Sequence, residues 1–198
     1  MIRTLAVLVL MAMLLGCGGG RQVTRLSPES TTDLSGKWND TDSRLVAQEM
    51  VSDCLMRVWV TDFAAAHGQK PVVTVGTIRN MSNEHINTET FTKDFERELI
   101  NSGKVRFVAS KGQRAEIREE RMEQREFASR ETMKQLREET GADFVLVGAI
   151  KTILDQVEGK KVIFYQTDLE LIHVENMEKA WIGTKKIKKG ISQGEWKL

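Results

Sequence analysis

The sequence predicts one α/β domain, an α+β sandwich in which helices flank a mixed, mostly antiparallel sheet of four to five strands. Two observations lead to this fold class. A strand, a helix and a second strand follow one another within residues 71–109, and three further strands joined by short turns fill residues 142–188. A βα unit and an antiparallel meander can share one sheet on which helices pack. The 198 residues are enough for one such domain.

Residues 1–16 predict a lipoprotein signal peptide. Arg3 precedes an unbroken apolar run, Leu5 to Leu15, which is typical of an export signal and too short to cross a bilayer. The run ends in Leu-Leu-Gly-Cys, which resembles the bacterial lipobox, so we expect Cys17 to receive a diacylglycerol. The alternative is plain secretion with a free or paired Cys17 thiol. With Cys17 acylated, Cys54 has no disulfide partner and is expected to be a buried packing residue.

Residues 17–37 are expected to be the lipidated cysteine and a flexible tether, and residues 38–198 a single globular domain. The segment from Gly18 to Thr32 is polar and has few large apolar side chains, so it cannot bury enough surface to offset its ordering entropy. Its 15 residues reach at most about 50 Å when fully extended. The domain is therefore expected to stay near the membrane.

The first element of the domain is predicted to be one helix that begins near Asp42 and ends at Gly68. Asp42 or Ser43 is the expected N-cap, and Gly68 followed by Pro71 stops the helix. Apolar residues recur with the spacing of one helical face: Ala47, Met50, Val51, Cys54, Leu55 and Val58.

A strand, a polar loop and a second helix follow. Residues 71–78 are rich in β-branched side chains and predict the strand, and residues 79–85 predict the loop. Asn87 or Thr88 is the expected N-cap of the second helix, which carries an apolar stripe and stops at Gly103.

Residues 104–109 predict another short strand, and a charge-rich stretch, Lys111 to Thr140, comes after it. Its thin apolar stripe predicts one or two largely exposed helices with a break near Ala128 and Ser129. Such helices are either a partner surface or solvated faces held by intrahelical ion pairs. The a/d repeat of a coiled coil is not sustained, which favours solvated faces.

The last three strands are expected to form the antiparallel meander. Residues 142–150 are almost continuously apolar, which is typical of a central strand covered on both faces. Residues 160–174 alternate between apolar and polar, and a turn at 176–179 leads to the last strand at 180–188. In the alternating strand, the buried parity is expected to hold Ile163, Tyr165, Leu169 and Leu171.

A basic cluster, Lys-Lys-Ile-Lys-Lys at 185–189, lies in this last strand. Strand alternation places Lys185 and Lys189 on one face and Lys186 and Lys188 on the other, so the cluster is not a single patch. Lysines on a terminal strand often protect a sheet edge from pairing with other chains. Contact with anionic headgroups near the anchoring membrane is the other interpretation.

The sequence gives no reason to expect an enzyme. His67, His85 and His173 are scattered and lack metal-ligand spacing, and nucleophile-elbow, P-loop and dinucleotide-binding signatures are absent. Asp168 and Glu170 share one strand face, but polar residues on the open face of a sheet explain this pair more simply than catalysis. We expect no metal, no cofactor and no small-molecule substrate. The balance of 29 Lys+Arg and 28 Asp+Glu also argues against nucleic-acid binding.

Four segments behind the lipobox resemble, in their order, the LpoB-like family of penicillin-binding-protein activators. The resemblance covers about residues 33–191. The segments that carry it are Asp33-Leu-Ser-Gly-Lys-Trp-Asn-Asp-Thr-Asp-Ser-Arg44, Val75-Gly-Thr-Ile-Arg-Asn-Met-Ser-Asn83 with Ile86-Asn-Thr88, Gly103-Lys-Val-Arg-Phe-Val108, and Gly141-Ala-Asp-Phe-Val-Leu-Val-Gly148.

This resemblance implies a domain similar to the N-terminal domain of TolB, in a lipoprotein at the periplasmic face of the outer membrane of a Gram-negative bacterium. The absence of Asp after Cys17 agrees with the outer membrane. The implied function is to bind and activate a bifunctional, class A penicillin-binding protein, and the family has no catalytic residues to carry over. Similar domains occur in curli-secretion and flagellar-ring lipoproteins, so the alternative is a subunit of an envelope secretion or flagellar assembly. The short tether departs from the long, proline-rich tether of the best-known members.

The candidate partner-binding residues are Arg79, Asn80, Asn83 and His85. They form a polar loop after a buried strand, where binding residues are often found. The other interpretation is that Asn80 and Asn83 satisfy hydrogen bonds of the turn.

Overall fold

The computed structural model describes residues 23–127 and 139–192. From Thr31 onward the chain forms one compact unit, and the residues up to Ser30 form a second. In the second unit, the Ser30 N–H donates to the Ser27 carbonyl at 3.0 Å and closes a turn. Cys17, the signal peptide and most of the predicted tether lie outside the described residues, so the domain boundaries stay predictions.

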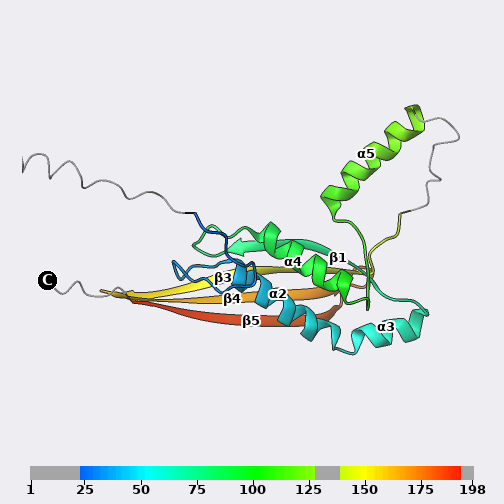
Figure 1. Cartoon of the computed structure of the whole chain (residues 1–198). Coiled ribbons are helices and arrows are strands. Elements are labelled where there is room, and N and C mark those ends of the chain that lie inside the picture. Colours follow the sequence, from blue (N-terminus) through cyan, green and yellow to red (C-terminus); the bar gives the residue numbers. More distant parts are fainter. Residues whose placement is uncertain (1–22, 128–138, 193–198) are drawn as a thin grey trace, which may run out of the picture. The chain divides into compact units, whose positions relative to one another are not determined.

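Helices and strands alternate in the first half of the compact unit, and three long strands fill the second half (Figure 1). The helices are α2 (Asp40–Leu55), α3 (Trp59–His67), α4 (Thr88–Asn101) and α5 (Lys111–Phe127). The strands are β1 (Val72–Met81), β2 (Arg106–Phe107), β3 (Phe144–Val157), β4 (Lys160–His173) and β5 (Lys179–Ser192).

The five strands form one sheet in the order β2-β1-β3-β4-β5. β2 and β3 run parallel to β1, whereas β3, β4 and β5 form an antiparallel meander. The predicted fold class, a mixed and mostly antiparallel sheet with flanking helices, is confirmed. The predicted meander is also confirmed, because β3 pairs with β4 up to Val157 and Lys160 and β4 pairs with β5; its second turn spans residues 174–178 rather than the predicted 176–179.

The first helix differs from its prediction, since it begins earlier and is interrupted. Asn39 is the N-cap, and it forms a capping box in which its side chain accepts from the Asp42 N–H while the Asp42 carboxylate accepts from the Asn39 N–H. α2 ends at Leu55, and α3 starts at Trp59. At the interruption, the Cys54 carbonyl accepts from the Trp59 indole N–H at 2.8 Å and from the Arg57 N–H at 3.3 Å.

Three strands are longer than their apolar residues predict; β5 is one of them, since it runs to Ser192 rather than ending at Lys188. β1 continues through Met81 and includes Arg79 and Asn80, which the sequence places in a loop. β3 runs to Val157 rather than ending at Ile150. The β1 and β3 extensions are polar or exposed, but every residue of the β3 extension finds a partner on β4, so backbone pairing sustains the strand without burial. β2, in contrast, is only two residues long.

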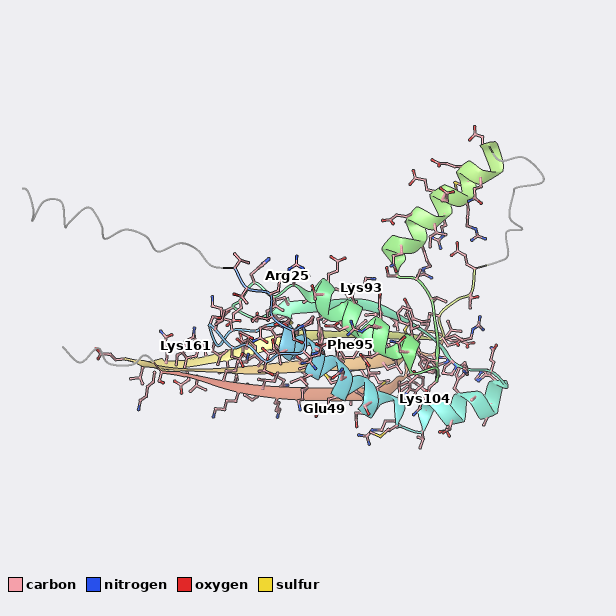
Figure 2. The ribbon with its side chains drawn as sticks, viewed as in Figure 1. Arg25, Glu49, Lys93, Phe95, Lys104 and Lys161 are labelled. Carbon is pink, nitrogen blue, oxygen red and sulfur yellow. The ribbon has the colours of Figure 1, made fainter. Side chains whose placement is uncertain are left out.

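α2 and α4 cover one face of the sheet, which we call the helix face; the opposite face is the open face (Figures 1 and 2). The core lies between the helices and the helix face. The predicted buried parity of β4 is confirmed, because Ile163, Tyr165, Leu169 and Leu171 are each at most 2% exposed. Coverage of β3 on both faces was a wrong prediction: Val145 and Val147, on the open face, are only partly buried, because no helix in the described residues packs there.

α5 is a charged, largely exposed helix, in agreement with its prediction. From within α5, Arg118 donates two hydrogen bonds of 2.7 Å to the carboxylate of Glu139, which follows the helix in the chain. The break predicted near Ala128 and the second helix predicted after it lie outside the described residues.

Gly148 is a position in the sheet where the backbone of the neighbouring strand excludes a side chain. A Cβ there would lie 2.2 Å from the Asp168 carbonyl oxygen and 2.5 Å from Leu169 Cδ2. We expect Gly148→Ala to lower the free energy of unfolding by about 2 kcal/mol, because the β4 backbone has to move. Gly190→Ala is the matched control in the same sheet, since a Cβ there meets nothing within 4 Å. It should change stability by less than about 0.5 kcal/mol. Urea denaturation measures both, and equal effects would contradict this account.

Candidate functional site

Arg79 lies on the open face near the carboxyl end of β1. Its guanidinium has no hydrogen bond or ion pair within the described parts of the chain. It lines a hollow of about 680 Å³ that crosses β1, β3 and β4. The other lining residues are Thr77, Met81, Val147, Gly148, Ala149, Lys151, Asp168 and Glu170.

The two acidic side chains of this hollow are held in ion pairs. Asp168 accepts from Lys151 at 3.0 Å, and also from the Thr184 hydroxyl and the Gln166 amide. Burial disfavours the charged form, but these hydrogen bonds outweigh it and hold the pKa of Asp168 below its usual value. Glu170 accepts from Lys179 at 2.8 Å. Asp168 therefore lacks the raised pKa that a general acid needs.

Asn80 stabilises the turn that follows β1. Its side-chain oxygen accepts from the Ser82 N–H at 3.0 Å and from the Ser82 hydroxyl at 2.6 Å, and its amide donates to the Glu84 carbonyl at 2.7 Å. These contacts match the turn interpretation of this residue.

Asn83 and His85 are exposed on the same turn, and the described residues offer no hydrogen-bond partner to the Asn83 side chain or the His85 ring. The Asn83 backbone N–H donates to the Thr152 hydroxyl at 3.2 Å. Because Thr152 points to the helix face, this turn lies on that side of β3, whereas Arg79 lies on the open face. The four candidate residues are thus near one another in sequence but do not form one patch.

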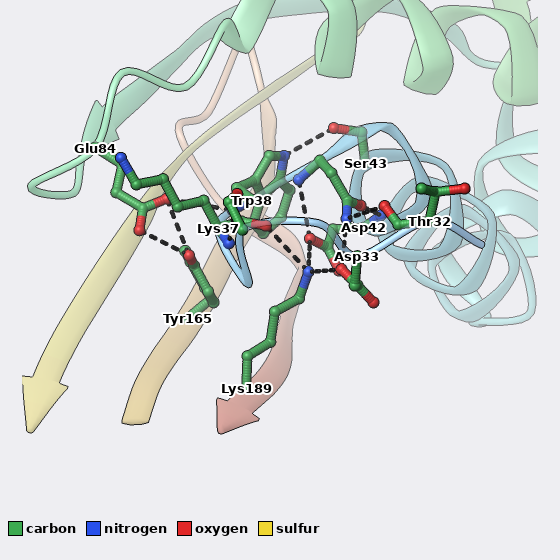
Figure 3. A network of polar contacts seen from close by, with 11 residues as sticks. Thr32, Asp33, Lys37, Trp38, Asp42, Ser43, Glu84, Tyr165 and Lys189 are labelled. Carbon is green, nitrogen blue, oxygen red and sulfur yellow. Dashed lines mark hydrogen bonds and ion pairs between the residues drawn. The ribbon is translucent and has the colours of Figure 1, made fainter. Parts of the chain in front are cut away.

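Glu84, which the sequence does not single out, fixes the turn to the core. Both of its carboxylate oxygens lie 2.9 Å from the Tyr165 hydroxyl, and one accepts from the Trp38 N–H at 3.2 Å (Figure 3). Burial and the adjacent carboxylate raise the pKa of Tyr165, so its hydroxyl remains a donor. The Trp38 ring packs edge-on against Tyr165 at 5.6 Å and against Phe91 at 6.0 Å. The exposed Asn83 and His85 therefore stand on a rigid turn.

Lys189 holds the segment before α2 against the end of β5. Its ammonium donates to Asp42 at 2.6 Å, to Asp33 at 2.7 Å and to the Lys37 carbonyl at 3.1 Å (Figure 3). Burial disfavours the charged ammonium, but the two carboxylates outweigh it and raise the pKa of Lys189. The bond from Lys189 also lowers the pKa of Asp33. The neighbouring Gly36, at φ +67°, packs on the side chain of Ile191.

Cys54 is buried and free, as predicted for a packing residue. Burial raises the pKa of its thiol to about 12, which leaves the thiolate scarce at neutral pH. Cys17, the predicted lipidation site, lies outside the described residues.

Within residues 23–127 and 139–192, no group of three or more His, Cys, Asp or Glu side chains is placed to hold a metal ion. No helix in the same residues is long and apolar enough to cross a membrane.

The sequence profile of the peptidoglycan-synthase activator LpoB matches residues 42–187, which is most of the chain. The chain belongs to the LpoB family. The first of the segments that carry the resemblance contains Asn39 and Asp42, which form the capping box of α2, so part of this segment maintains the fold. No curated protein matches the chain significantly in sequence.

Several solved structures are similar to the chain. The LpoB C-terminal domain from Escherichia coli is 20% identical with a TM-score of 0.41, covering 77% of this chain and 99% of that one. Lipoprotein GNA1162 from Neisseria meningitidis is 15% identical with a TM-score of 0.37, covering 64% and 88%. A PelC dodecamer from Paraburkholderia phytofirmans is 21% identical with a TM-score of 0.33, covering 63% and 75%.

Substitutions of two consecutive lysines, Lys188 and Lys189, test how much the contacts of Lys189 with Asp33 and Asp42 stabilise the fold. We expect Lys189→Met to lower the free energy of unfolding by about 2 kcal/mol, because it leaves the nearly buried Asp42 carboxylate without its cation. Lys188→Met, on the open face, should cost less than about 0.5 kcal/mol. Urea denaturation followed by tryptophan fluorescence measures both.

The same pair of variants has a predicted pH dependence. The pKa of Asp33 is lowered in the folded state by its bond from Lys189. A group of this kind stabilises the fold above its unfolded pKa, and this contribution is lost as the pH falls. The gap between wild type and Lys189→Met should therefore narrow below about pH 4. A gap that stays constant between pH 7 and pH 3, or equal losses in the two variants at pH 7, would contradict the assignment.

Proposed function

We propose that this protein is a non-enzymatic lipoprotein that binds and activates a bifunctional, class A penicillin-binding protein. The observation that carries the proposal is the match of residues 42–187 to the peptidoglycan-synthase activator family. The anchor is the lipid expected on Cys17, at the periplasmic face of the outer membrane. The rigid turn with Asn83 and His85 and the unpaired Arg79 are the proposed contacts, and they lie on two sides of the end of β1.

The anchoring part of the proposal has its own test. In cells, the wild-type protein should fractionate with the outer membrane, and its N-terminal peptide should begin at Cys17 with a mass that includes the acyl chains. Two or three chains exceed what stable anchoring needs, so Cys17→Ser should leave the outer-membrane fraction almost completely. Plain secretion predicts instead that wild type and Cys17→Ser fractionate alike.

The binding part is tested with purified class A penicillin-binding proteins in solution. Wild-type protein should be recovered in a pull-down and should raise glycosyltransferase activity. Truncation of a central contact typically costs tenfold or more in affinity, so we expect about a tenfold loss for Arg79→Glu or for Asn83→Ala with His85→Ala. Glu175→Ala, in the exposed β4–β5 turn, is the matched control and should bind as wild type does.

Two outcomes would change the assignment. If no class A penicillin-binding protein is recovered, the activator function is wrong. A stable homo-oligomeric ring seen by light scattering would then favour the alternative, a subunit of an envelope secretion or flagellar assembly.

A further inference from the structure

The free end of the β3–β4 hairpin presents apolar side chains on the open face. Ile153 is 67% exposed and Val157 is 72% exposed. Cross-strand pairing places the half-buried Phe164 opposite Ile153, and Val162, two pairs closer to the turn, opposite Asp155. This end of the hairpin extends past α2 and α4, which pack on the opposite face of the sheet. Lys161 is labelled at the same end in Figure 2. The hairpin end is thus an exposed apolar strip without a partner in the described residues.

Lysines surround this strip. Lys188 lies opposite Phe164 on β5, Lys186 is two residues away on the same face, and Lys160 lies opposite Val157. None of the three forms an ion pair or hydrogen bond with the described residues. The two lysines of the basic cluster that point to the helix face differ, because Lys185 pairs with Glu49 and Lys189 with Asp33 and Asp42.

The acidic side chains at this end are Asp155 and Glu158, so the three lysines outnumber them. An apolar strip bordered by unpaired cations is typical of a surface that rests in a membrane interface, where long lysine side chains reach the headgroups.

The chain enters the domain at the same end of the sheet. Asp33 bonds to Lys189, and Gly36 packs on Ile191, near the last residues of β5. Only the 15 residues from Gly18 to Thr32 separate this point from Cys17, which is at most about 50 Å of chain. A lipid on Cys17 would therefore keep the hairpin end within reach of the bilayer at all times.

We infer that the open face of the β3–β4 hairpin end rests on the bilayer that holds the anchor, and that anionic phospholipid headgroups are its ligand. This inference rests on the lipidation of Cys17 in the proposed function. It also places the two groups of proposed partner contacts: the turn with Asn83 and His85 lies on the helix face and would point away from the membrane, whereas Arg79 lies on the open face, farther along the sheet from the hairpin end. The partner-binding turn is then presented to the periplasm.

Lysine footprinting on vesicles tests the contact. Residues 17–198 are coupled through Cys17 to a maleimide lipid, which supplies the anchor whether or not cells acylate the cysteine. Cys54 does not compete, since it is buried and its thiol has a pKa of about 12. The protein is acetylated briefly on vesicles that contain phosphatidylglycerol and on vesicles of phosphatidylcholine alone, and mass spectrometry gives the rate at each lysine.

We expect Lys160, Lys186 and Lys188 to react at least about threefold more slowly on phosphatidylglycerol vesicles, and the protection to fall at high salt. Lys93 and Lys104, on the helix side, should react at the same rate on both vesicles. Ile153→Ser with Val157→Ser should weaken the protection without unfolding the domain, because both side chains are exposed.

Equal rates on the two kinds of vesicle would overturn the inference. Protection that follows the surface density of the protein, rather than phosphatidylglycerol, would assign the face to a second copy of the chain and would also overturn it. Neither result bears on the synthase pull-down, which uses protein in solution, so the failure of this inference is distinct from the failure of the proposed function.

Discussion

The ammonium of Lys189 is the interaction on which the N-terminal part of the domain depends. It neutralises two carboxylates that come from different places, Asp42 in the first turn of α2 and Asp33 seven residues before the helix starts. Asp42 also completes the capping box, so one carboxylate both starts α2 and ties it to β5. Because Lys189 holds the segment from Asp33 to Lys37 in place, Trp38 can contact Glu84 and Tyr165. These contacts in turn hold the turn after β1. Removal of the cation would loosen each of these contacts in turn.

The sequence predicts the fold class and the meander because alternation and turn residues are local signals. It misses the interruption between α2 and α3, where the Trp59 indole bonds to the Cys54 carbonyl. It also misses the long β3–β4 hairpin, because a polar strand is sustained by its partner strand and not by its own composition. Such nonlocal causes leave no periodic signal in the chain.

The candidate site shows the same limit. Arg79, Asn80, Asn83 and His85 are close in sequence, but the pleat of β1 and the turn after it send them to different surfaces, and Asn80 is committed to the turn. Glu84 looks like another polar loop residue until its partners, 46 and 81 positions away, are known. The basic cluster of β5 is a similar case. Strand alternation predicts that its lysines divide between two faces, but it does not predict that Lys185 and Lys189 form ion pairs with carboxylates of α2.

Gly36 and Asp33 also determine how tension on the proposed lipid anchor would reach the domain. A pull on the chain before Thr32 acts first on the bond from the Asn39 amide to the Thr32 carbonyl, next on the contacts of Asp33 and Gly36 with β5, and then on Trp38. The load is divided between the end of an edge strand and the start of α2, so the backbone ladder of the sheet is not peeled from one side. With the proposed lipid on Cys17, force from the cell envelope would therefore load these side-chain contacts before it loads the sheet.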